Sequence, residues 1–169
     1  MPKTEMQEDR IGAAARLPSH VLVRPAWADE GPALTELAMK AKARWGYDEA
    51  FMALCRDELT ITGRRIGCER VRVAEVGGIA AGFSAMKAGE GKASIEDLFV
   101  SPRFMGTGLG QILVDDFLDY ARRHGIATVH VEADPNAAPF YAHLGFIQCG
   151  EVPSGSIPGR MLPLMEVRF

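Results

Sequence analysis

The sequence has 169 residues, enough for one domain with a substantial core and too few for two ordinary ones. It is 47% hydrophobic and 24% charged, a composition typical of a folded soluble protein, and no apolar stretch reaches the roughly 20 residues that span a bilayer. A net charge of −3 without a basic stripe argues against nucleic acid as the main partner. We therefore expect neither a nucleic-acid nor a membrane partner, and a cytoplasmic location, because the N-terminus is acidic and lacks an apolar signal core.

Apolar periodicity predicts one mixed domain over 19–169 after a polar, mobile extension at 1–18. Asp29 is the expected N-cap of the first helix. In chain order we predict a strand at 21–26, helices at 28–44 and 48–60, strands at 71–76, 79–88 and 94–100, a helix after a glycine-rich turn, a strand at 128–133, a short helix at 139–144, and strands at 147–152 and 161–169.

The glycine-rich turn between the strand at 94–100 and the following helix is the most informative segment. It carries three alternating glycines, and no Ser, Asp or Asn caps the helix, so several backbone amides lack a local acceptor. An anion is the natural partner of such amides, because glycines let a phosphate approach the backbone. The expected phosphate- or pyrophosphate-binding residues are Met105, Gly106, Thr107, Gly108, Leu109, Gly110 and Gln111.

Two other nucleotide motifs fit this turn poorly. A Walker A loop needs Lys and then Ser or Thr after its last glycine, where this chain has Gln111 and Ile112. A GxGxxG fingerprint would need its third glycine at Gln111. A magnesium-dependent phosphoryl transferase is therefore disfavoured, and a Rossmann-like nucleotide-binding module remains a weak alternative.

The segment MGTGLG at 105–110 resembles the pyrophosphate loop of the GNAT superfamily of acetyl-CoA-dependent N-acetyltransferases. Met105 stands where that family usually has Gln or Arg, so backbone amides would hold the pyrophosphate. The pattern also matches from Arg103, but that register places its second glycine too early for the helix. A second block, NAAPFYAHLGF at 136–146, is similar to the family's Asn, Tyr and Leu-Gly-Phe segment. Two blocks in this order, about 30 residues apart, are more specific than one loop.

The resemblance covers most of residues 20–169 and implies an α+β GNAT fold. This fold has a central, mostly antiparallel mixed sheet of six to seven strands, flanked by about four helices, with a splay between the fourth and fifth strands. These strands are 94–100 and 128–133 here. The cosubstrate implied is acetyl-CoA, whose pantetheine arm would add to the first of them as a short strand. Backbone groups of Phe99 and Val100 are the expected partners.

The implied reaction moves an acetyl group to a primary amine of a small molecule or peptide, by direct attack in a ternary complex. A base must deprotonate the amine, and Glu96 is the first candidate because residues 94, 96, 98 and 100 would share one strand face. Asp97 is the second, and a solvated acidic pair is an equal alternative. A strand amide near Leu98 or Phe99 would stabilise the oxyanion. Tyr141 matches the tyrosine that protonates the CoA thiolate, with core packing as its alternative.

Four further residues have two interpretations each. Asn136 matches the family's asparagine near pantetheine and also precedes the helix that it would cap. Trp45 and Tyr47 lie in the connection that borders the acceptor site in this fold, although an aromatic pair is more often core. Arg160, in the loop at 154–160, would hold a carboxylate or be a solvated hairpin residue.

Neither cysteines nor histidines predict a metal. Cys55, Cys68 and Cys149 lack CxxC spacing and form no even set, so buried free thiols are expected, and the four histidines show no ligand spacing. The rival function from another class is a non-catalytic acyl-CoA-binding sensor, which would keep the glycines but need neither Glu96 nor Tyr141. A homodimer remains open, and nothing in the sequence names the acceptor amine.

Overall fold

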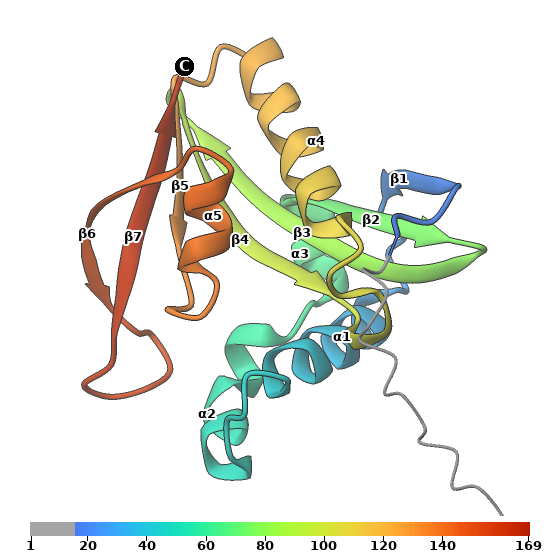
Figure 1. Cartoon of the computed structure of the whole chain (residues 1–169), viewed down its shortest axis with the longest axis horizontal. Coiled ribbons are helices and arrows are strands. Elements are labelled where there is room, and N and C mark those ends of the chain that lie inside the picture. Colours follow the sequence, from blue (N-terminus) through green and yellow to red (C-terminus); the bar gives the residue numbers. More distant parts are fainter. Residues whose placement is uncertain (1–15) are drawn as a thin grey trace, which may run out of the picture.

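The structure is a computed structural model that describes residues 16–169, so the predicted extension at 1–18 falls outside it except for its last three residues. Seven strands form one sheet in the order β1-β2-β3-β4-β5-β7-β6, parallel only between β4 and β5 (Figure 1). The elements are β1 (Val21–Pro25), α1 (Gly31–Ala43), α2 (Glu49–Leu59), α3 (Gly63–Cys68), β2 (Arg70–Val76), β3 (Ile79–Gly89), β4 (Lys92–Val100), a 3-10 turn (Pro102–Phe104), α4 (Leu109–Arg123), β5 (Thr128–Glu132), α5 (Ala138–His143), β6 (Ile147–Pro153) and β7 (Met161–Arg168).

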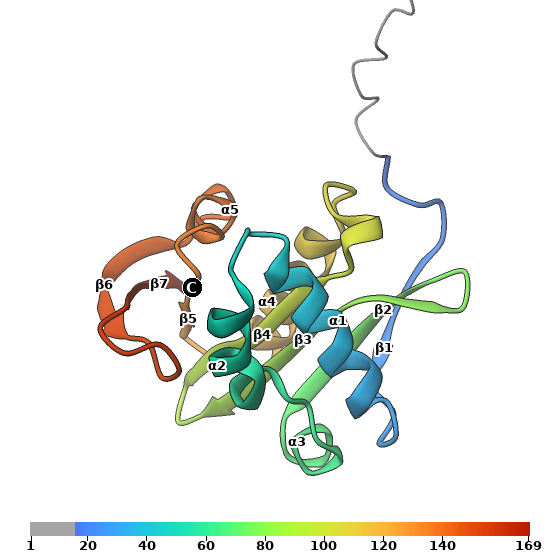
Figure 2. The same ribbon diagram turned by 90° about the horizontal axis from the view of Figure 1, so that it is seen from below.

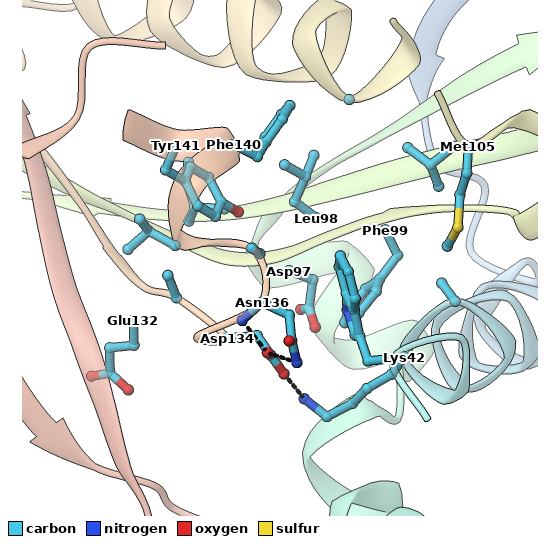
Figure 3. A pocket seen from close by; sticks show the side chains of 18 of the residues that line it. Lys42, Asp97, Leu98, Phe99, Met105, Glu132, Asp134, Asn136, Phe140 and Tyr141 are labelled. Atoms are coloured by element: carbon cyan, nitrogen blue, oxygen red, sulfur yellow. Dashed lines mark hydrogen bonds and ion pairs between the residues drawn. The ribbon is translucent and has the colours of Figure 1, made fainter. Parts of the chain in front are cut away.

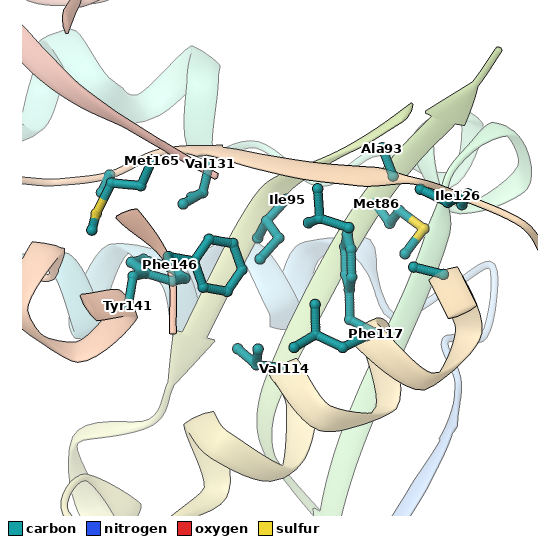
Figure 4. Packing of buried hydrophobic residues seen from close by; sticks show 14 residues of the cluster. Met86, Ala93, Ile95, Val114, Phe117, Ile126, Val131, Tyr141, Phe146 and Met165 are labelled. Carbon is teal, nitrogen blue, oxygen red and sulfur yellow. The ribbon is translucent and has the colours of Figure 1, made fainter. Parts of the chain in front are cut away.

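Helices cover both faces of the sheet. α1 and α2 lie over one face of β3 and β4, and α4 lies over the other (Figure 2). α4 buries the side of its surface that carries Leu113, Phe117 and Ala121, each at most 1% exposed. Figure 4 shows Phe117 packed in the cluster that α5 completes with Tyr141. Burying one such Phe contributes roughly 1.5–3 kcal/mol, so the α4 face fixes the helix, and with it the preceding turn, against the sheet.

A bulge in β4 opens the sheet beside β5. The register pairs Met86 with Ile95 and then Ala85 with Asp97, which leaves Glu96 as the extra residue of β4. A bulge bends its strand and increases the local twist. β4 accordingly pairs with β5 only from Lys92 to Ile95, and the remainder of β4 diverges. This is the splay that the resemblance predicted, and the bulge is its local cause.

The bulge also changes which side chains share a face. Ile95 and Leu98 pack on the α4 side, whereas Phe99 packs with the α1 and α2 cluster. Ser94 and Glu96 lie on the face opposite α4 and are hydrogen-bonded to each other. The predicted common face for 94, 96, 98 and 100 is therefore wrong, because period-two alternation fails across an inserted residue.

Other departures from the predicted elements are small. The predicted cap Asp29 is wrong, because α1 begins at Gly31, after Glu30, whose carboxylate accepts from the Trp27 N–H. The six-residue α3 was not predicted; it is too short for a periodic apolar face. All three cysteines are free, but only Cys55 is buried. The described residues 16–169 contain no helix long and apolar enough to cross a membrane.

Candidate active site

A cavity of about 520 Å³ lies where β4 and β5 diverge (Figure 3). Its wall at one end is the glycine-rich turn and the start of α4, and its middle is the C-terminal half of β4 facing α5. At the other end are side chains from α1, from the segment after β5, and from the loop between β6 and β7. Segments distant in the sequence therefore meet at the splay.

The turn at 105–111 presents unpaired backbone amides to this cavity. Gly106 and Gly108 have left-handed φ values of 75° and 93°, and Gly108 occupies the N-cap of α4. The first helical bond runs from the Ile112 N–H to the Gly108 carbonyl. Within the described chain, the N–H groups of Gly106 and of residues 108–111 have no acceptor. The amides that the sequence analysis expected to lack a local acceptor are therefore free, and convergent free donors at a helix start are suited to an anion.

The glycine at 110 has a different reason from the one at 108. A Cβ on Gly110 would lie 3.2 Å from the Phe140 ring of α5, a tight contact inside the protein. Gly110 thus lets α5 approach α4, whereas left-handed geometry requires Gly108. The Thr107 hydroxyl donates a hydrogen bond to the Phe104 carbonyl at 2.6 Å, and this bond closes the turn. Met105 points toward the cavity beside this turn (Figure 3).

The diverging half of β4 offers backbone groups to the cavity. The Ser101 N–H donates to its partner on β3, and hydrogen-bonded pairs alternate along an antiparallel ladder, so the N–H and C=O of Phe99 also face β3. The Phe99 carbonyl oxygen does lie on the β3 side, because it is 2.9 Å from the position that a Cβ on Gly82 of β3 would take. The groups on the open edge are those of Leu98 and Val100. This fits the prediction for Val100 and corrects it for Phe99, which contributes its side chain to the wall.

Tyr141 reaches the cavity from α5, on the α4 side of the sheet. Its side chain is 5% exposed, and its hydroxyl points toward the cavity in Figure 3. Burial, together with the charge of Asp97, raises the pKa of this phenol well above its usual value. The hydroxyl has no hydrogen-bond partner within residues 16–169 and therefore keeps its proton available for a ligand. Tyr141 also packs edge-on against Phe146, so both of its predicted roles are compatible.

Asp97 approaches the same gap from the opposite face of the sheet. It is 5% exposed, lines the cavity, and accepts from the Arg65 guanidinium at 2.5 Å. Burial raises the pKa of Asp97 to about 6 and outweighs the opposing effect of Arg65. Arg65 also forms two hydrogen bonds with Glu69, at 3.0 and 2.9 Å, so α3 holds the guanidinium behind Asp97. The short helix that was not predicted thus places Asp97.

Glu96 is more exposed than Asp97, although it borders the same cavity. Its carboxylate accepts from the Ser94 hydroxyl and from the Lys87 ammonium, the latter at 3.2 Å. Both partners lie on the open surface of the sheet. Asp97, the second predicted base, is buried in surroundings that bring its pKa toward neutrality.

The far end of the cavity is organised around Asp134, which the sequence analysis missed. Its carboxylate accepts from the Lys42 ammonium at 3.2 Å, the Tyr47 hydroxyl at 2.9 Å, the Asn136 N–H at 2.9 Å and the Arg160 guanidinium at 3.3 Å. Burial raises the pKa of Asp134, but the Asn136 amide and Lys42 more than offset this and bring it below its ordinary value. The only sequence signal was position, directly after a buried strand.

Three predicted residues belong to this Asp134 cluster. The Tyr47 hydroxyl accepts from Asn136 Nδ2 at 2.9 Å and from Arg160 Nη2 at 2.6 Å. The helix cap predicted for Asn136 is wrong, because Ala137 occupies the N-cap position of α5 and Asn136 turns to Tyr47 and Asp134. Arg160 is not a solvated hairpin residue. Trp45 lines the cavity but is 49% exposed, outside the cluster.

A family model described as an acetyltransferase (GNAT) domain matches residues 49–155, more than half of the chain. The chain belongs to the GNAT acetyltransferase family. The matched region includes the bulge in β4, the glycine-rich turn and the segment at 136–146. The family resemblance and the predicted α+β fold are both confirmed, with five α-helices rather than about four in the described part of the chain.

Comparison with known GNAT proteins gives short sequence matches and long structural ones. An uncharacterized N-acetyltransferase ycf52 of Gracilaria tenuistipitata var. liui is 42% identical over 55 residues, 32% of this chain and 30% of that protein. Glucosamine 6-phosphate N-acetyltransferase of Trypanosoma brucei brucei is 35% identical over 60 residues, 36% of this chain and 41% of that protein. The matched stretches span less than half of these curated relatives.

Two solved structures share the fold over most of the chain. PaiA N-acetyltransferase of Thermoplasma acidophilum, in complex with coenzyme A, superposes with a TM-score of 0.74 at 17% identity over 89% of this chain and 99% of that chain. YncA of Salmonella typhimurium, solved with acetyl-CoA, has a TM-score of 0.62 at 22% identity, over 89% and 94%. At such identities the likeness establishes the architecture of this GNAT domain and leaves its acceptor open.

Proposed function

We propose that this chain transfers the acetyl group of acetyl-CoA to a primary amine, by direct attack within a ternary complex. The observation that carries the proposal is one continuous cavity with free amides at one end, a buried carboxylate and phenol at its centre, and a polar cluster at the other. Two substrates can therefore meet at the splay without a covalent enzyme intermediate.

The residues around the glycine-rich turn fit a pyrophosphate. The free N–H groups of Gly106 and of 108–111 supply donors, and the α4 N-terminus supplies partial positive charge. The open-edge backbone groups of Leu98 and Val100 fit the amides of a pantetheine arm. When bound, acetyl-CoA would supply the activated thioester. Met105 offers no charge, so backbone donors hold the pyrophosphate.

Asp97 is the proposed base. An alkylamine with a pKa near ~10 is almost wholly protonated at neutral pH, so a proton must leave before attack. With a pKa of about 6, Asp97 is ionised at neutral pH and still basic enough to take that proton, directly or through water. Glu96 is the alternative; its bonds to Ser94 and Lys87 compete with this task.

Tyr141 is the proposed acid, and Leu98 the proposed oxyanion donor. The raised pKa keeps the phenol protonated, and the hydroxyl faces the cavity. A leaving thiolate in the same apolar pocket would take this proton. The Leu98 N–H lies on the open edge of β4, where a developing oxyanion would accept from it. Base and acid thus come from opposite faces of the sheet and meet through the splay.

Binding and turnover test the proposal separately. Acetyl-CoA at 100 times its dissociation constant should stabilise the protein by about 2.7 kcal/mol in thermal unfolding, and NADH should not. Release of CoA thiol should then depend on added amine, measured across amino acids, polyamines, aminoglycosides and peptides. An acyl-CoA sensor would bind without amine-dependent release. If NADH raises the melting temperature and acetyl-CoA does not, both the acetyltransferase and the acyl-CoA sensor are contradicted, and a Rossmann-like module is favoured.

A further inference from the structure

The Asp134 cluster has more positive than negative charge. Lys42 Nζ and Arg160 Nη2 both contact the same Asp134 oxygen, at 3.2 and 3.3 Å. Their side chains are 14% and 18% exposed, so the two cations are well removed from bulk water. Two cations and one carboxylate give the cluster itself a net charge of +1, because its other members, Tyr47 and Asn136, are neutral.

The cluster also has more unused hydrogen-bond donors than unused acceptors. Asp134 is saturated, since its two oxygens accept from four residues. Lys42 has three N–H groups and uses one on Asp134, and Arg160 Nη1 and Nε have no hydrogen-bond partner within the described residues. Unused donors on partly buried cations favour an acceptor-only, negatively charged group.

The aromatic pair beside the cations holds them in place. Tyr47 and Phe51 stack with ring centroids 3.9 Å apart, and the Arg160 guanidinium carbon lies 5.0 Å from the Phe51 ring centroid. Lys42 Nζ lies 5.6 Å from the Tyr47 ring centroid. Cation–π contact on one side leaves the other directions of each cation for a ligand.

We infer that the acceptor carries a carboxylate as well as the amine, and that Lys42 and Arg160 bind this carboxylate. The inference rests on the proposed acetyl transfer. A singly charged carboxylate matches the net charge of +1, whereas a phosphate dianion would exceed it. Glu58 and Glu132 also line the cavity, but neither forms an ion pair with Lys42 or Arg160, whose carboxylate partner is Asp134. Amino acids and short peptides have this chemistry.

Matched pairs of acceptors test the carboxylate directly. The probes are L-amino acids and the corresponding amino-acid amides, with saturating acetyl-CoA and CoA release as the readout. The amide has the more easily deprotonated amine, so intrinsic reactivity works against the expected result. We expect kcat/KM for at least one acid to exceed that for its amide roughly ten- to a hundredfold. Glucosamine 6-phosphate and glucosamine form the corresponding phosphate pair.

Two variants assign this preference to the cluster. Lys42→Met and Arg160→Met should each lower the acid-to-amide ratio of kcat/KM toward one, and the dissociation constant of acetyl-CoA shows whether the rest of the site is intact. A purely structural role would lower both substrates together. Lys40→Met and Arg56→Met are the matched controls, because these exposed cations lie on the neighbouring surfaces of α1 and α2, outside the cavity wall.

Three outcomes would overturn the carboxylate inference while acetyl transfer itself is intact. They are equal turnover of acids and amides, preference for glucosamine 6-phosphate over every acid, and a wild-type ratio that both variants retain. In each case acetyl-CoA binding and amine acetylation persist, so the proposed transfer survives. If no carboxylate-bearing amine reacts while acetyl-CoA binds normally, the inference also fails. Loss of acetyl-CoA binding itself would instead count against the proposed function.

Discussion

The cavity end beside the glycine-rich turn is built from backbone of one continuous segment, whereas the end beside Asp134 is built from side chains of three separate parts of the chain. At the first end, left-handed glycines and a helix N-terminus expose amides. At the second, Lys42, Tyr47, Asn136 and Arg160 converge on one carboxylate. A backbone site accommodates any ligand with the same anion, while a side-chain site can change with each substitution.

This difference predicts which measurements each region controls. Variants of the glycine-rich turn should change acetyl-CoA binding for every acceptor. Variants of the Asp134 cluster should change acceptor discrimination alone. Residues between the two ends should change turnover with little effect on either affinity. Each experiment below tests one of these separations.

The largest expected effect is that of Tyr141→Phe. The ring and its contact with Phe146 remain, but the hydroxyl that faces the cavity is lost. Turnover should fall by roughly 10² to 10⁴, the usual range for a general acid. Acetyl-CoA affinity, measured by calorimetry, and thermal stability should hardly change. Tyr120→Phe, on α4 outside the cavity, is the matched control. Full turnover in Tyr141→Phe would assign Tyr141 to packing alone.

Gly108→Asp should weaken acetyl-CoA binding by at least ~100-fold, or about 2.7 kcal/mol. A carboxylate would stand among the amides that face the pyrophosphate, at a left-handed φ of 93°. Gly77→Asp is the control for backbone strain, because Gly77 has a φ of 57° in the distant hairpin turn. Calorimetry on both variants separates the two contributions. Normal binding by a folded Gly108→Asp protein would remove this turn from the site.

Asp97→Asn should lower kcat/KM about 10²-fold at neutral pH, with recovery as pH rises toward the pKa of the amine. Wild-type activity should decline below pH about 6, where Asp97 gains its proton. Glu96→Gln should retain turnover and move this decline to lower pH, because the Glu96 charge helps to raise the pKa of Asp97. If instead Glu96→Gln loses activity at neutral pH and Asp97→Asn retains it, Glu96 is the base, as the strand pattern alone suggested.

Sequence reasoning reached the backbone end of the cavity. At the side-chain end it named Tyr47, Asn136 and Arg160, but it missed Lys42 and the carboxylate of Asp134 on which all four converge. Alternating glycines, an uncapped helix and a preceding strand are local signals, and they located the turn at 105–111. The bulge at Glu96 reverses side-chain alternation, and a two-residue period cannot reveal it. Arg65 acts from a helix of six residues, and Lys42 meets Asp134 across 92 positions of sequence. Such contacts depend on the folded sheet, which no window of sequence contains.

The smallest expected effect concerns stability rather than rate. Burial raises the pKa of Asp97 from 3.8 to about 6, so the native state binds a proton that the unfolded state has released. This contribution is fully present below pH about 4 and is lost as pH rises through 6. Asp97→Asn lacks the titration, and Glu69 still pairs with Arg65 in that variant. The unfolding free energy of the variant, minus that of the wild type, should therefore increase between pH 4 and 6.

The increase should be on the order of 1–3 kcal/mol, since one pKa unit corresponds to about 1.36 kcal/mol. Urea unfolding at closely spaced pH values from 4 to 8 measures it, with exposed Asp115→Asn on α4 as the control for removal of one carboxylate. Only the change of this free-energy difference with pH is diagnostic, because loss of the hydrogen bond from Arg65 changes the absolute stability of the variant at every pH. A difference that stays constant across this range would show that Asp97 ionises as easily in the folded protein as in the unfolded chain. The base would then have to be sought at Glu96, on the open side of the bulge.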